Sequence, residues 1–341
     1  MTMKTEMKNL DRESLRRLME QRGERAFRAD QIFRWLYKRD AASFEEMTDL
    51  NQPLQQKLDA AFCIQRSSLA SRMDSEDGTV KMLLRFPDGA QVETVLIPDA
   101  GRVTVCVSSQ VGCNLGCAFC RTGTMRCERN LQTWEILEQV QAAARHNPER
   151  PVSNVVFMGM GEPLLNYEAV VAACRILKDD LGMNFSNRRI TVSTVGIIPA
   201  LGKLGRDVEI SLAVSLHSAD DATRSRLVPI NKKYPLKDLI QACREFPLSN
   251  RRRITYEYTM LSGVNDSDED AHQLRRLMTP LKAHVNLIFF NPWQGCSFKP
   301  TPEKRVREFQ RILLDGKINC VVRKSRGRDI LAACGQLKSK V

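Results

Sequence analysis

Cys113-Asn-Leu-Gly-Cys117-Ala-Phe-Cys120 is the stretch of this sequence that decides its fold and its chemistry. The three cysteines have the spacing Cys-x3-Cys-x2-Cys, with no fourth cysteine in phase. Three thiolates can hold three irons of a cubic iron–sulfur cluster and leave the fourth iron open to a ligand. A structural zinc site would need two pairs of ligands, or cysteine with histidine. The spacing therefore predicts a cluster with an open iron; three reduced cysteines on a turn are the alternative.

Composition indicates in which cellular compartment the protein works and which class of molecule it binds. The 341 residues include 52 Lys+Arg against 40 Asp+Glu, a formal net charge of +12, which favours nucleic acid as a partner over a protein that is merely basic. Eleven cysteines without a signal peptide favour a reducing compartment. No run approaches the roughly 18 apolar residues needed to span a membrane. We expect a cytoplasmic protein with no membrane partner.

A basic helical segment begins the chain. NLDRESLRRLMEQRG has apolar residues at helical spacing behind Asp11, a typical N-terminal cap, and AFRADQIFRWLYKRD repeats the pattern. In the second helix we expect one apolar face, made of Phe27, Ile32, Phe33, Leu36 and Tyr37. The other face carries the basic residues Arg25, Arg28, Arg34, Lys38 and Arg39. We expect residues 1–66 to form a helical accessory domain, whose basic face either contacts RNA or is simply solvated.

The character of the sequence changes over residues 67–102. TVKMLLRF and AQVETVLIP are rich in β-forming residues and flank Pro87-Asp88-Gly89, which together predict a hairpin. RVTVCVSS follows as a further strand and leads directly into the three cysteines. We expect residues 67–102 to be a β-hairpin extension that links the accessory domain to a core of residues 103–341.

The core alternates predicted strands with predicted helices. The strands are VTVCVS, VSNVVFMG, RRITVSTVG, EISLAVSLH, RITYEYTML and HVNLIFFNP, with a last short one at INCVVR. Helical stretches such as LQTWEILEQVQAAARH, YEAVVAACRILKD and SDEDAHQLRRLMTPL lie between them. Such alternation predicts a parallel sheet with helices outside, and six units indicate a partial TIM-like barrel. Its reacting groups should lie at the carboxyl ends of the strands.

The turn Gly159-Met160-Gly161-Glu162-Pro163 follows the strand after the cysteines. Its two glycines let the backbone approach a ligand closely, and Glu162 could accept a hydrogen bond from a ligand ammonium. Alone, this pattern also suits an ordinary strand-to-helix turn. Its position one strand–helix unit after the cysteines favours a ligand site.

Six stretches together make the chain resemble a known family. They are SSQVGCNLGCAFC, FMGMGEPLLN, ITVSTVGIIP, LAVSLH, GVND and SRGRDILAACGQL, and they resemble the RlmN/Cfr family of radical S-adenosylmethionine (SAM) RNA methyltransferases over nearly the whole chain. The resemblance implies an α/β fold: a partial (β/α)6 TIM-like radical SAM barrel with a small helical N-terminal accessory domain and a β-hairpin extension. AFRADQIFRWLY and FEEMTDL favour the branch that methylates carbon 2 of an adenine in 23S ribosomal RNA (rRNA) and of the adenine beside the anticodon in certain tRNAs.

Motif by motif, the resemblance implies a role for individual residues. One 4Fe–4S cluster would be held by three cysteine ligands, Cys113, Cys117 and Cys120. SAM would be bound by Gly161, Glu162, Ser193, Ser215, Leu216, His217 and Asn291. The catalytic residues would be Cys334, the thiol that becomes methylated, with Cys106 as its partner cysteine and Glu93 as the catalytic glutamate.

The same resemblance implies a two-step use of SAM. One SAM methylates Cys334, and a second gives a radical that activates this methyl group for addition to the adenine. Glu93 takes the carbon-2 proton, and Cys106 then attacks the sulfur of Cys334, which leaves a disulfide to be reduced. The implied partners are 23S rRNA, tRNA and a low-potential electron donor such as flavodoxin or ferredoxin. The protein itself is expected to be a monomer.

The chain departs from the family pattern in two places and leaves alternatives open. Arg126-Cys127 stands where the family often has Gly-Phe, and Phe289 or Phe290 where it has Pro. Because Cys127 adds a thiol near the loop, counting cysteines does not force the ligand assignment. Cys334 could also be a buried helical cysteine, and Cys106 and His217 could be core residues.

Three other functions remain compatible with the sequence. The same machinery could methylate adenine carbon 8, as Cfr-type resistance enzymes do. A radical SAM activase or maturase would act on a protein instead of RNA. A non-catalytic iron–sulfur RNA-binding protein would not cleave SAM at all.

Overall fold

A ten-stranded mixed sheet forms the core of the protein. The computed structural model describes residues 4–249 and 252–338. The strand order is β14-β13-β12-β11-β10-β9-β6-β5-β4-β3. The strands that run parallel are β6 (Arg102–Cys106), β9 (Asn154–Phe157), β10 (Ile190–Thr194), β11 (Ser211–Ser215), β12 (Ile254–Met260), β13 (Ala283–Phe289) and β14 (Asn319–Arg323). The predicted partial barrel is confirmed, because every predicted strand of the core is present in chain order.

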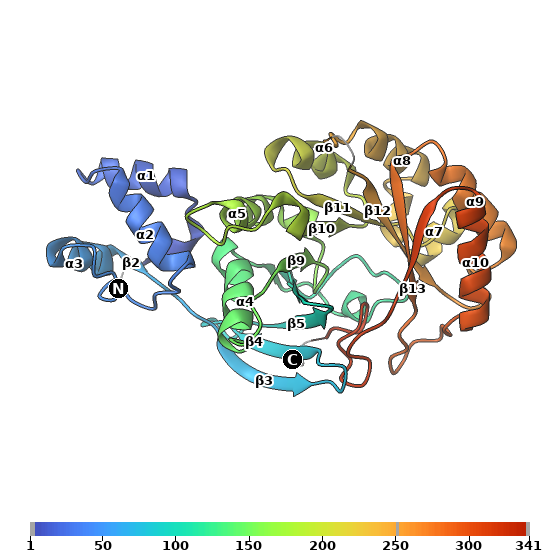
Figure 1. The fold of residues 1–341 in the computed structure, drawn as a ribbon, viewed down its shortest axis with the longest axis horizontal. Coiled ribbons are helices and arrows are strands. Elements are labelled where there is room, and N and C mark those ends of the chain that lie inside the picture. Colours follow the sequence, from blue (N-terminus) through green and yellow to red (C-terminus); the bar gives the residue numbers. More distant parts are fainter. Residues whose placement is uncertain (1–3, 250–251, 339–341) are drawn as a thin grey trace.

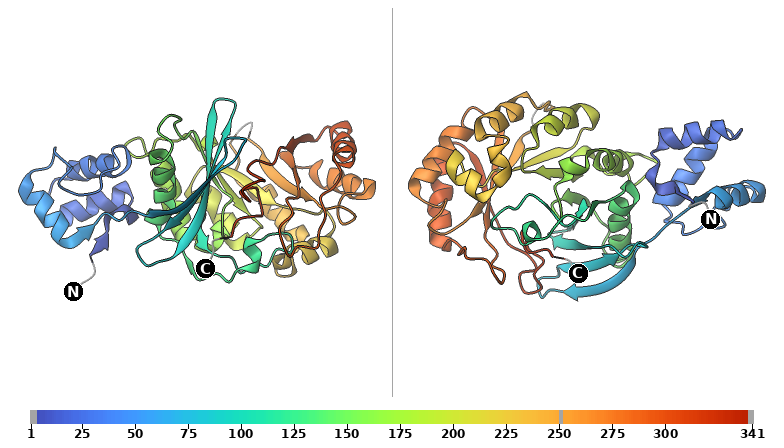
Figure 2. Two further views of the ribbon diagram at one scale, coloured as in Figure 1. Left: turned by 90° about the horizontal axis from the view of Figure 1, so that it is seen from below. Right: turned by 180° about the vertical axis from the view of Figure 1, so that it is seen from behind.

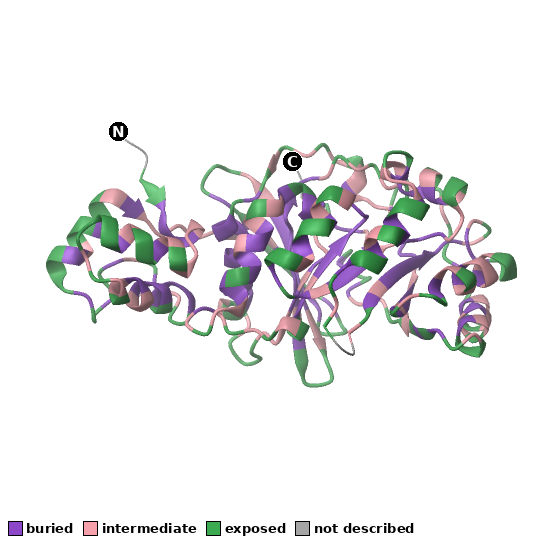
Figure 3. Ribbon diagram, turned by 90° about the horizontal axis from the view of Figure 1, so that it is seen from above, coloured by how far each residue is buried: buried purple, intermediate pink, exposed green. Residues whose placement is uncertain are grey.

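Helices cover the outside of this parallel sheet (Figure 1). They are α4 (Thr133–Arg145), α5 (Tyr167–Lys178), α6 (Ile198–Asp207), α7 (Asp221–Leu227), α8 (Leu236–Glu245), α9 (Asp268–Met278) and α10 (Glu303–Asp315). Their buried faces pack on the sheet and their outer faces are exposed (Figure 3). In the described part of the chain, none of the helices is long and apolar enough to cross a membrane.

The extension contains one strand more than the sequence analysis predicts. β4 (Val80–Arg85) and β5 (Gln91–Asp99) form the predicted hairpin, and β5 continues antiparallel against β6. β3 (Ser68–Asp74) pairs with β4 and forms the edge of the sheet. Six of its seven side chains are exposed, so it lacks the alternation of buried and exposed residues by which strands are recognised. Two short strand pairs complete the fold: β1 (Thr5–Glu6) with β2 (Phe62–Cys63), and β7 (Gln110–Val111) with β8 (Arg129–Asn130).

The accessory helices form one end of an elongated molecule, with α9 and α10 at the other end (Figure 2). They are α1 (Arg12–Gln21), α2 (Phe27–Tyr37) and α3 (Gln52–Ala61), and Asp11 caps α1 as predicted by accepting the backbone N–H of Ser14. The predicted apolar face of α2 is wrong for Phe27, which is 46% exposed. It lies about two and a half turns before Leu36, and therefore on the opposite side of the helix.

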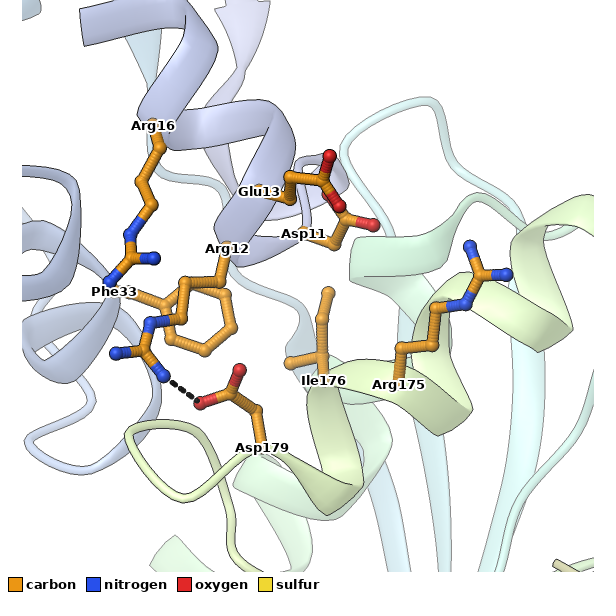
Figure 4. Close-up of a pocket in the computed structure, with 8 residues that line it drawn as sticks. All are labelled: Asp11, Arg12, Glu13, Arg16, Phe33, Arg175, Ile176 and Asp179. Carbon is orange, nitrogen blue, oxygen red and sulfur yellow. Dashed lines mark hydrogen bonds and ion pairs between the residues drawn. The ribbon is translucent and has the colours of Figure 1, made fainter. Parts of the chain in front are cut away.

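The accessory helices dock on the barrel through a seam with two different sides. On one side, Lys8 donates from Nζ to Glu138 of α4 at 3.1 Å, and both side chains are fully buried. On the other side lies a water-accessible cavity of about 450 Å³ between α1, α2 and α5 (Figure 4). There Arg12 donates to Asp179 at 3.5 Å and to the exposed Asp180 at 2.9 Å. The seam is thus dry and charged on one side and solvated on the other.

Candidate active site

The three predicted cluster ligands lie on one loop after β6 and β7, between residues 112 and 128. Gly112 has φ +84°, and a Cβ there would be 2.2 Å from the carbonyl oxygen of Arg126, so the two ends of the loop touch. The side chain of Asn114 accepts the backbone N–H of Cys127 at 2.7 Å and closes the loop a second time. The thiols of Cys113, Cys117 and Cys120 are half-buried within it. The loop is a compact cradle formed by local sequence.

The thiols of this loop lie within electrostatic reach of one another. Burial, and then the negative charges of Cys120 and Glu162, raise the pKa of Cys113 to about 11. Burial and then the charges of Cys120 and Cys113 also raise the pKa of Cys117. Thiolates so placed require a cationic group to hold them, and an iron–sulfur cluster is such a group.

No three Cys, His, Asp or Glu side chains of residues 4–249 and 252–338 converge on a point as a single metal ion would require. A cubic cluster binds each cysteine through a different iron. The finding therefore bears on a single-ion site, and the ligand set of the cluster stays a prediction.

The turn after β9 is hydrogen-bonded to residues 107–110, which lead into the cysteine loop. Gly159 donates to Val107 O at 3.0 Å, Ser109 donates to Met160 O at 2.8 Å, and the N–H of Glu162 reaches Gln110 Oε1 at 2.8 Å. A Cβ on Gly161 (φ +94°) would be 2.5 Å from the side chain of Gln110. The glycines of this turn are needed because two backbones pass each other there.

Glu162 is a buried carboxylic acid between two strand ends. Its carboxylate accepts the backbone N–H of Leu164 and of Val195, each at 3.0 Å. Burial raises its pKa to about 7, although these hydrogen bonds oppose the rise. The remaining lone pairs can accept from a ligand, and a cationic ligand would favour the ionised form.

The predicted SAM-binding residues of the next two strands lie at the carboxyl ends of β10 and β11 or directly after β11. Ser193 of β10 and Ser215 of β11 share one face of the sheet by register, whereas the side chain of Leu216 is fully buried and leaves only its backbone available. His217 has φ +57°, and its Nδ1 accepts the N–H of Thr259 at 3.1 Å. Burial lowers the pKa of His217 to about 3, so its ring is neutral.

Arg224 is the residue that sequence reasoning missed in this region. Its fully buried guanidinium donates to Leu216 O at 3.1 Å, Val195 O at 2.7 Å and Ser215 O at 3.2 Å. It therefore fixes the ends of β10 and β11 relative to each other. Burial lowers its pKa to about 10, which leaves it charged at neutral pH. The sequence does not indicate that Arg224 is buried, since a buried arginine in a short polar helix has the same sequence pattern as an exposed one.

A segment that we name the carrier segment, Leu331–Lys338, brings Cys334 to the cysteine loop. Arg121 donates from its backbone to Gly335 O at 2.7 Å, and Thr122 donates to Leu337 O at 2.6 Å. Asn291, after β13, donates to Cys334 O at 3.3 Å. The Oδ1 atom of Asn291 is buried and has no partner in the described structure, so it is available to a hydrogen-bond donor of a ligand.

Cys334 lies within electrostatic reach of both Cys106 and the cluster loop. The side chain of Cys334 is solvent-accessible, although the protein atoms around it raise the pKa of its thiol, with a smaller contribution from Cys120. Burial, and then the charge of Cys334, raises the pKa of Cys106. All eleven cysteines, within the residues described, are free thiols, so the disulfide expected during the reaction is not a feature of this structure.

Glu93 belongs to the same surface as Cys106. Val95 pairs with Cys106 across β5 and β6, and Glu93 lies two residues before Val95 on the same face of the sheet. The carboxylate of Glu93 is bound on both oxygens: Oε1 pairs with Lys81 at 3.2 Å, and Oε2 accepts the N–H of Lys338 at 2.6 Å. Lys81 was not among the residues singled out by the sequence, because it stands in an ordinary alternating strand.

The predicted site residues therefore gather at one end of the barrel. Electrostatic interactions connect the cysteine loop with Glu162 and with Cys334. Hydrogen bonds connect the carrier segment with Asn291 and with Glu93. The residues fit a 4Fe–4S cluster with SAM, since the loop carries three thiols, Glu162 has lone pairs left for a cationic ligand, and Asn291 has an unused acceptor.

Comparison with known proteins first defines the class. The family model described as "Radical SAM superfamily" matches residues 107–274, and "Ribosomal RNA large subunit methyltransferase N-terminal domain" matches residues 5–64. The crystal structure of a radical SAM methyltransferase from Sphaerobacter thermophilus superposes with a TM-score of 0.91, at 44% identity, over 98% of this chain and 99% of that one. The protein is a radical SAM enzyme, a class whose cofactors are a 4Fe–4S cluster and SAM.

Curated relatives then define the family. The dual-specificity RNA methyltransferase RlmN of Pelobacter propionicus is 48% identical over 100% of this chain and 98% of its own length. The protein of the same name from Geobacter sulfurreducens is 49% identical over 98% of this chain and 92% of its own length. The chain belongs to the RlmN family of radical SAM RNA methyltransferases, as the resemblance indicated.

Proposed function

We propose that this enzyme methylates carbon 2 of an adenine in 23S rRNA and of the adenine beside the anticodon in certain tRNAs. The observation that carries the proposal is the position of Cys334, which is held against the cysteine loop through Arg121 and Gly335 and lies within electrostatic reach of Cys106. The names of the relatives, dual-specificity RNA methyltransferases, support the choice of two kinds of RNA as substrates.

Carbon 2 of adenine lies between two ring nitrogens and is too electron-poor to attack the methyl group of SAM. A thiolate is a good nucleophile, so Cys334 takes the methyl group first by ordinary displacement. When bound by Cys113, Cys117 and Cys120, the cluster would supply the electron that splits a second SAM and thereby generates the radical for hydrogen removal from this methyl group. The resulting methylene radical on the sulfur of Cys334 can then add to carbon 2. The adduct becomes a thioether between protein and RNA once it loses the carbon-2 proton and one electron, which the oxidised cluster would take back.

Glu93 and Cys106, on the shared face of β5 and β6, complete the reaction. Glu93 accepts the carbon-2 proton once Oε2 is released from the N–H of Lys338, and its oxygen already faces the carrier segment. The Cys106 thiolate attacks the sulfur of Cys334 and breaks the bond from this sulfur to the methylene carbon. That carbon takes up a proton as the methyladenine is released, and a transient Cys106–Cys334 disulfide remains. Reduction of this disulfide restores the two thiols. The SAM molecule is assigned to Gly161, Glu162, Ser193, Ser215, Leu216, His217 and Asn291.

The remaining assignments belong to the same proposal. Residues 1–66 act as an RNA-binding accessory domain, residues 67–102 as the extension that carries Glu93, and residues 103–341 as the catalytic core. A low-potential donor such as flavodoxin or ferredoxin supplies electrons to a monomeric enzyme in the cytoplasm. The charge of +12 supports a polyanionic substrate, and it predicts that RNA affinity falls steeply with salt.

The two thiols outside the loop provide the decisive test. Cys334→Ala should abolish methyl transfer at its first step, because no acceptor remains. Cys106→Ala should be methylated at Cys334 and couple to RNA, but it cannot release the product. Denaturing gels of this variant expressed in cells, with and without ribonuclease, should show a protein–RNA adduct that the nuclease removes.

The double variant Cys106→Ala with Cys334→Ala is the control and should form no adduct. If Cys106→Ala is folded and carries its iron but yields no nuclease-sensitive adduct, the two-cysteine chemistry is wrong for this chain. Nucleosides from RNA modified by the wild-type enzyme, separated by chromatography beside 2-methyladenosine and 8-methyladenosine standards and detected by mass spectrometry, distinguish carbon 2 from carbon 8.

A further inference from the structure

Lys81 is a buried cation beside the candidate active site that the proposed chemistry does not use. Its side chain is 8% exposed, and its Nζ pairs with Glu93 Oε1 at 3.2 Å. The same Nζ donates to the carbonyl oxygen of Leu331, the first residue of the carrier segment, at 3.3 Å. A buried ammonium group needs such partners, and here both belong to the machinery of the proposed reaction.

The strand register explains why Lys81 reaches Glu93. Lys81 pairs with Val95, and Glu93 pairs with Leu83, so the two charged residues are diagonal neighbours on one face of β4 and β5. Long side chains on such diagonal positions can meet. Val95 pairs in turn with Cys106 on β6. Lys81, Glu93 and Cys106 therefore share one face across three neighbouring strands.

The carrier segment is tied to this face on both sides of Cys334. Before Cys334, Lys81 holds the carbonyl of Leu331, a residue with φ +53° that a leucine rarely adopts. After Cys334, the N–H of Lys338 binds Glu93 Oε2 at 2.6 Å. One ion pair thus connects the two attachment points, so a displacement of Lys81 would move Glu93 relative to Cys334.

We propose that Lys81 is a positioning residue, which holds the Glu93 carboxylate and the Cys334-bearing segment in register so that both address the same adenine carbon. The inference rests on the proposed function and adds a residue to it. Methylation of Cys334 does not need Glu93, and neither does cleavage of SAM. Loss of Lys81 should therefore leave these two events intact and uncouple them from product formation.

The test measures coupling with Lys81→Met, whose unbranched side chain is one atom shorter than that of lysine and has no charge. Protein from cells is assayed for iron, for methylated Cys334 by mass spectrometry, and for 5′-deoxyadenosine and methyladenine formed on a 23S rRNA fragment. Iron and Cys334 methylation should stay within about twofold of wild type. The ratio of 5′-deoxyadenosine to methyladenine should rise at least about tenfold, the scale at which misplaced reacting groups reduce rates.

Lys8→Met is the matched control, since Lys8 is also a fully buried lysine paired with a carboxylate, at the accessory seam. It should lower stability without changing the ratio. Lys81→Arg keeps a positive charge with several donors and should bring the ratio back towards wild type. If Lys81→Met does not retain its cluster, Lys81→Gln takes its place in the same assay, because it removes the positive charge and shortens the side chain but keeps a polar group in the buried site.

Two outcomes would overturn the inference. One is a folded Lys81→Met enzyme with an unchanged ratio. The other is an equal rise in Lys8→Met, which would show a general effect of lost stability. Failure of the proposed function would look different, because wild-type enzyme would then carry no methyl group on Cys334 and form no methyladenine, whatever residue stands at position 81.

Discussion

Glu162 shows how one residue makes the stability of this protein depend on pH. Its carboxyl group is buried, and the N–H groups of Leu164 and Val195 do not fully offset the loss of solvation of its ionised form. The pKa is near its ordinary value of 4.5 in the unfolded chain and about 7 in the folded protein. Between these values the folded state binds more protons than the unfolded state.

The free energy of unfolding should therefore fall as pH rises from about 4.5 to about 7, and this contribution should level off above pH 7. The shift corresponds to about 3 kcal/mol, at about 1.4 kcal/mol per pKa unit. Denaturant unfolding of cluster-free protein across this range, compared with Glu162→Gln, isolates the effect. The difference between the two proteins should diminish towards low pH; parallel curves would contradict the prediction.

At the scale of single residues, the sequence identifies candidate functional residues only where their spacing is characteristic of a type of site. Cys113, Cys117 and Cys120 are of this kind, because three thiols within eight positions seldom occur together except at a metal centre. Arg224 and Lys81 are not, because their importance comes from burial and from partners distant in sequence, such as Val195 for one and Leu331 for the other. Single-residue patterns carry no information about such partners.

Among the elements, the cysteine loop is the one most tightly specified by sequence. Two of its glycines adopt positive φ angles, +84° at Gly112 and +65° at Gly116, which non-glycine residues rarely adopt. Only Gly112 also has a backbone atom in the way of a Cβ, at 2.2 Å, whereas Gly116 has nothing within 4 Å. An alanine at Gly116 would therefore meet only conformational strain, whereas an alanine at Gly112 would meet both strain and a steric clash.

Gly112→Ala should open the loop and lower the iron content of purified protein to less than half of wild type. Gly116→Ala should retain most of its iron, since it bears only the strain of a left-handed alanine, about 1–2 kcal/mol. Iron analysis and the visible absorbance of anaerobically purified variants measure this directly. Equal iron in the two variants would mean that the contact between the ends of the loop does not matter.

Elements of the barrel were predictable because their composition repeats. Buried strands such as Ile254–Met260 and helices such as Asp268–Met278 alternate with clear boundaries, and each appears where the pattern indicates. The edge strand Ser68–Asp74 was missed because it is held by backbone pairing with β4 and buries little. The carrier segment, which has no regular structure, was recognisable only through a family motif.

For the whole molecule, the seam between accessory helices and barrel decides whether they move together. Glu138 is fully buried and accepts from Lys8, from the backbone and hydroxyl of Ser67, and from Arg145. Removing one partner of such a buried ion pair leaves an uncompensated charge. On the solvated side of the seam, Arg12 and its partner Asp180 are 25% and 77% exposed, where an ion pair contributes little.

Glu138→Ala should lower the free energy of unfolding by about 3–5 kcal/mol. Asp180→Ala, which removes only the exposed partner of Arg12, should lower it by about 1 kcal/mol or less. Denaturant titrations followed by tryptophan fluorescence can compare them, because Trp35 and Trp134 lie on the two sides of this seam. Similar losses in both variants would show that the solvated side contributes as much as the buried one.

The attachment of the carrier segment has a consequence for the order in which the protein assembles. Neighbouring strands of the barrel are mostly close in sequence, so they can pair as the chain lengthens. The bonds of the carrier segment instead span 215 residues from Thr122 to Leu337, 245 from Glu93 to Lys338 and 250 from Lys81 to Leu331. Such distant contacts form late, after the sheet that receives them exists. We expect the cysteine loop to remain uncovered until then, so that a cofactor could enter it before the carrier segment docks.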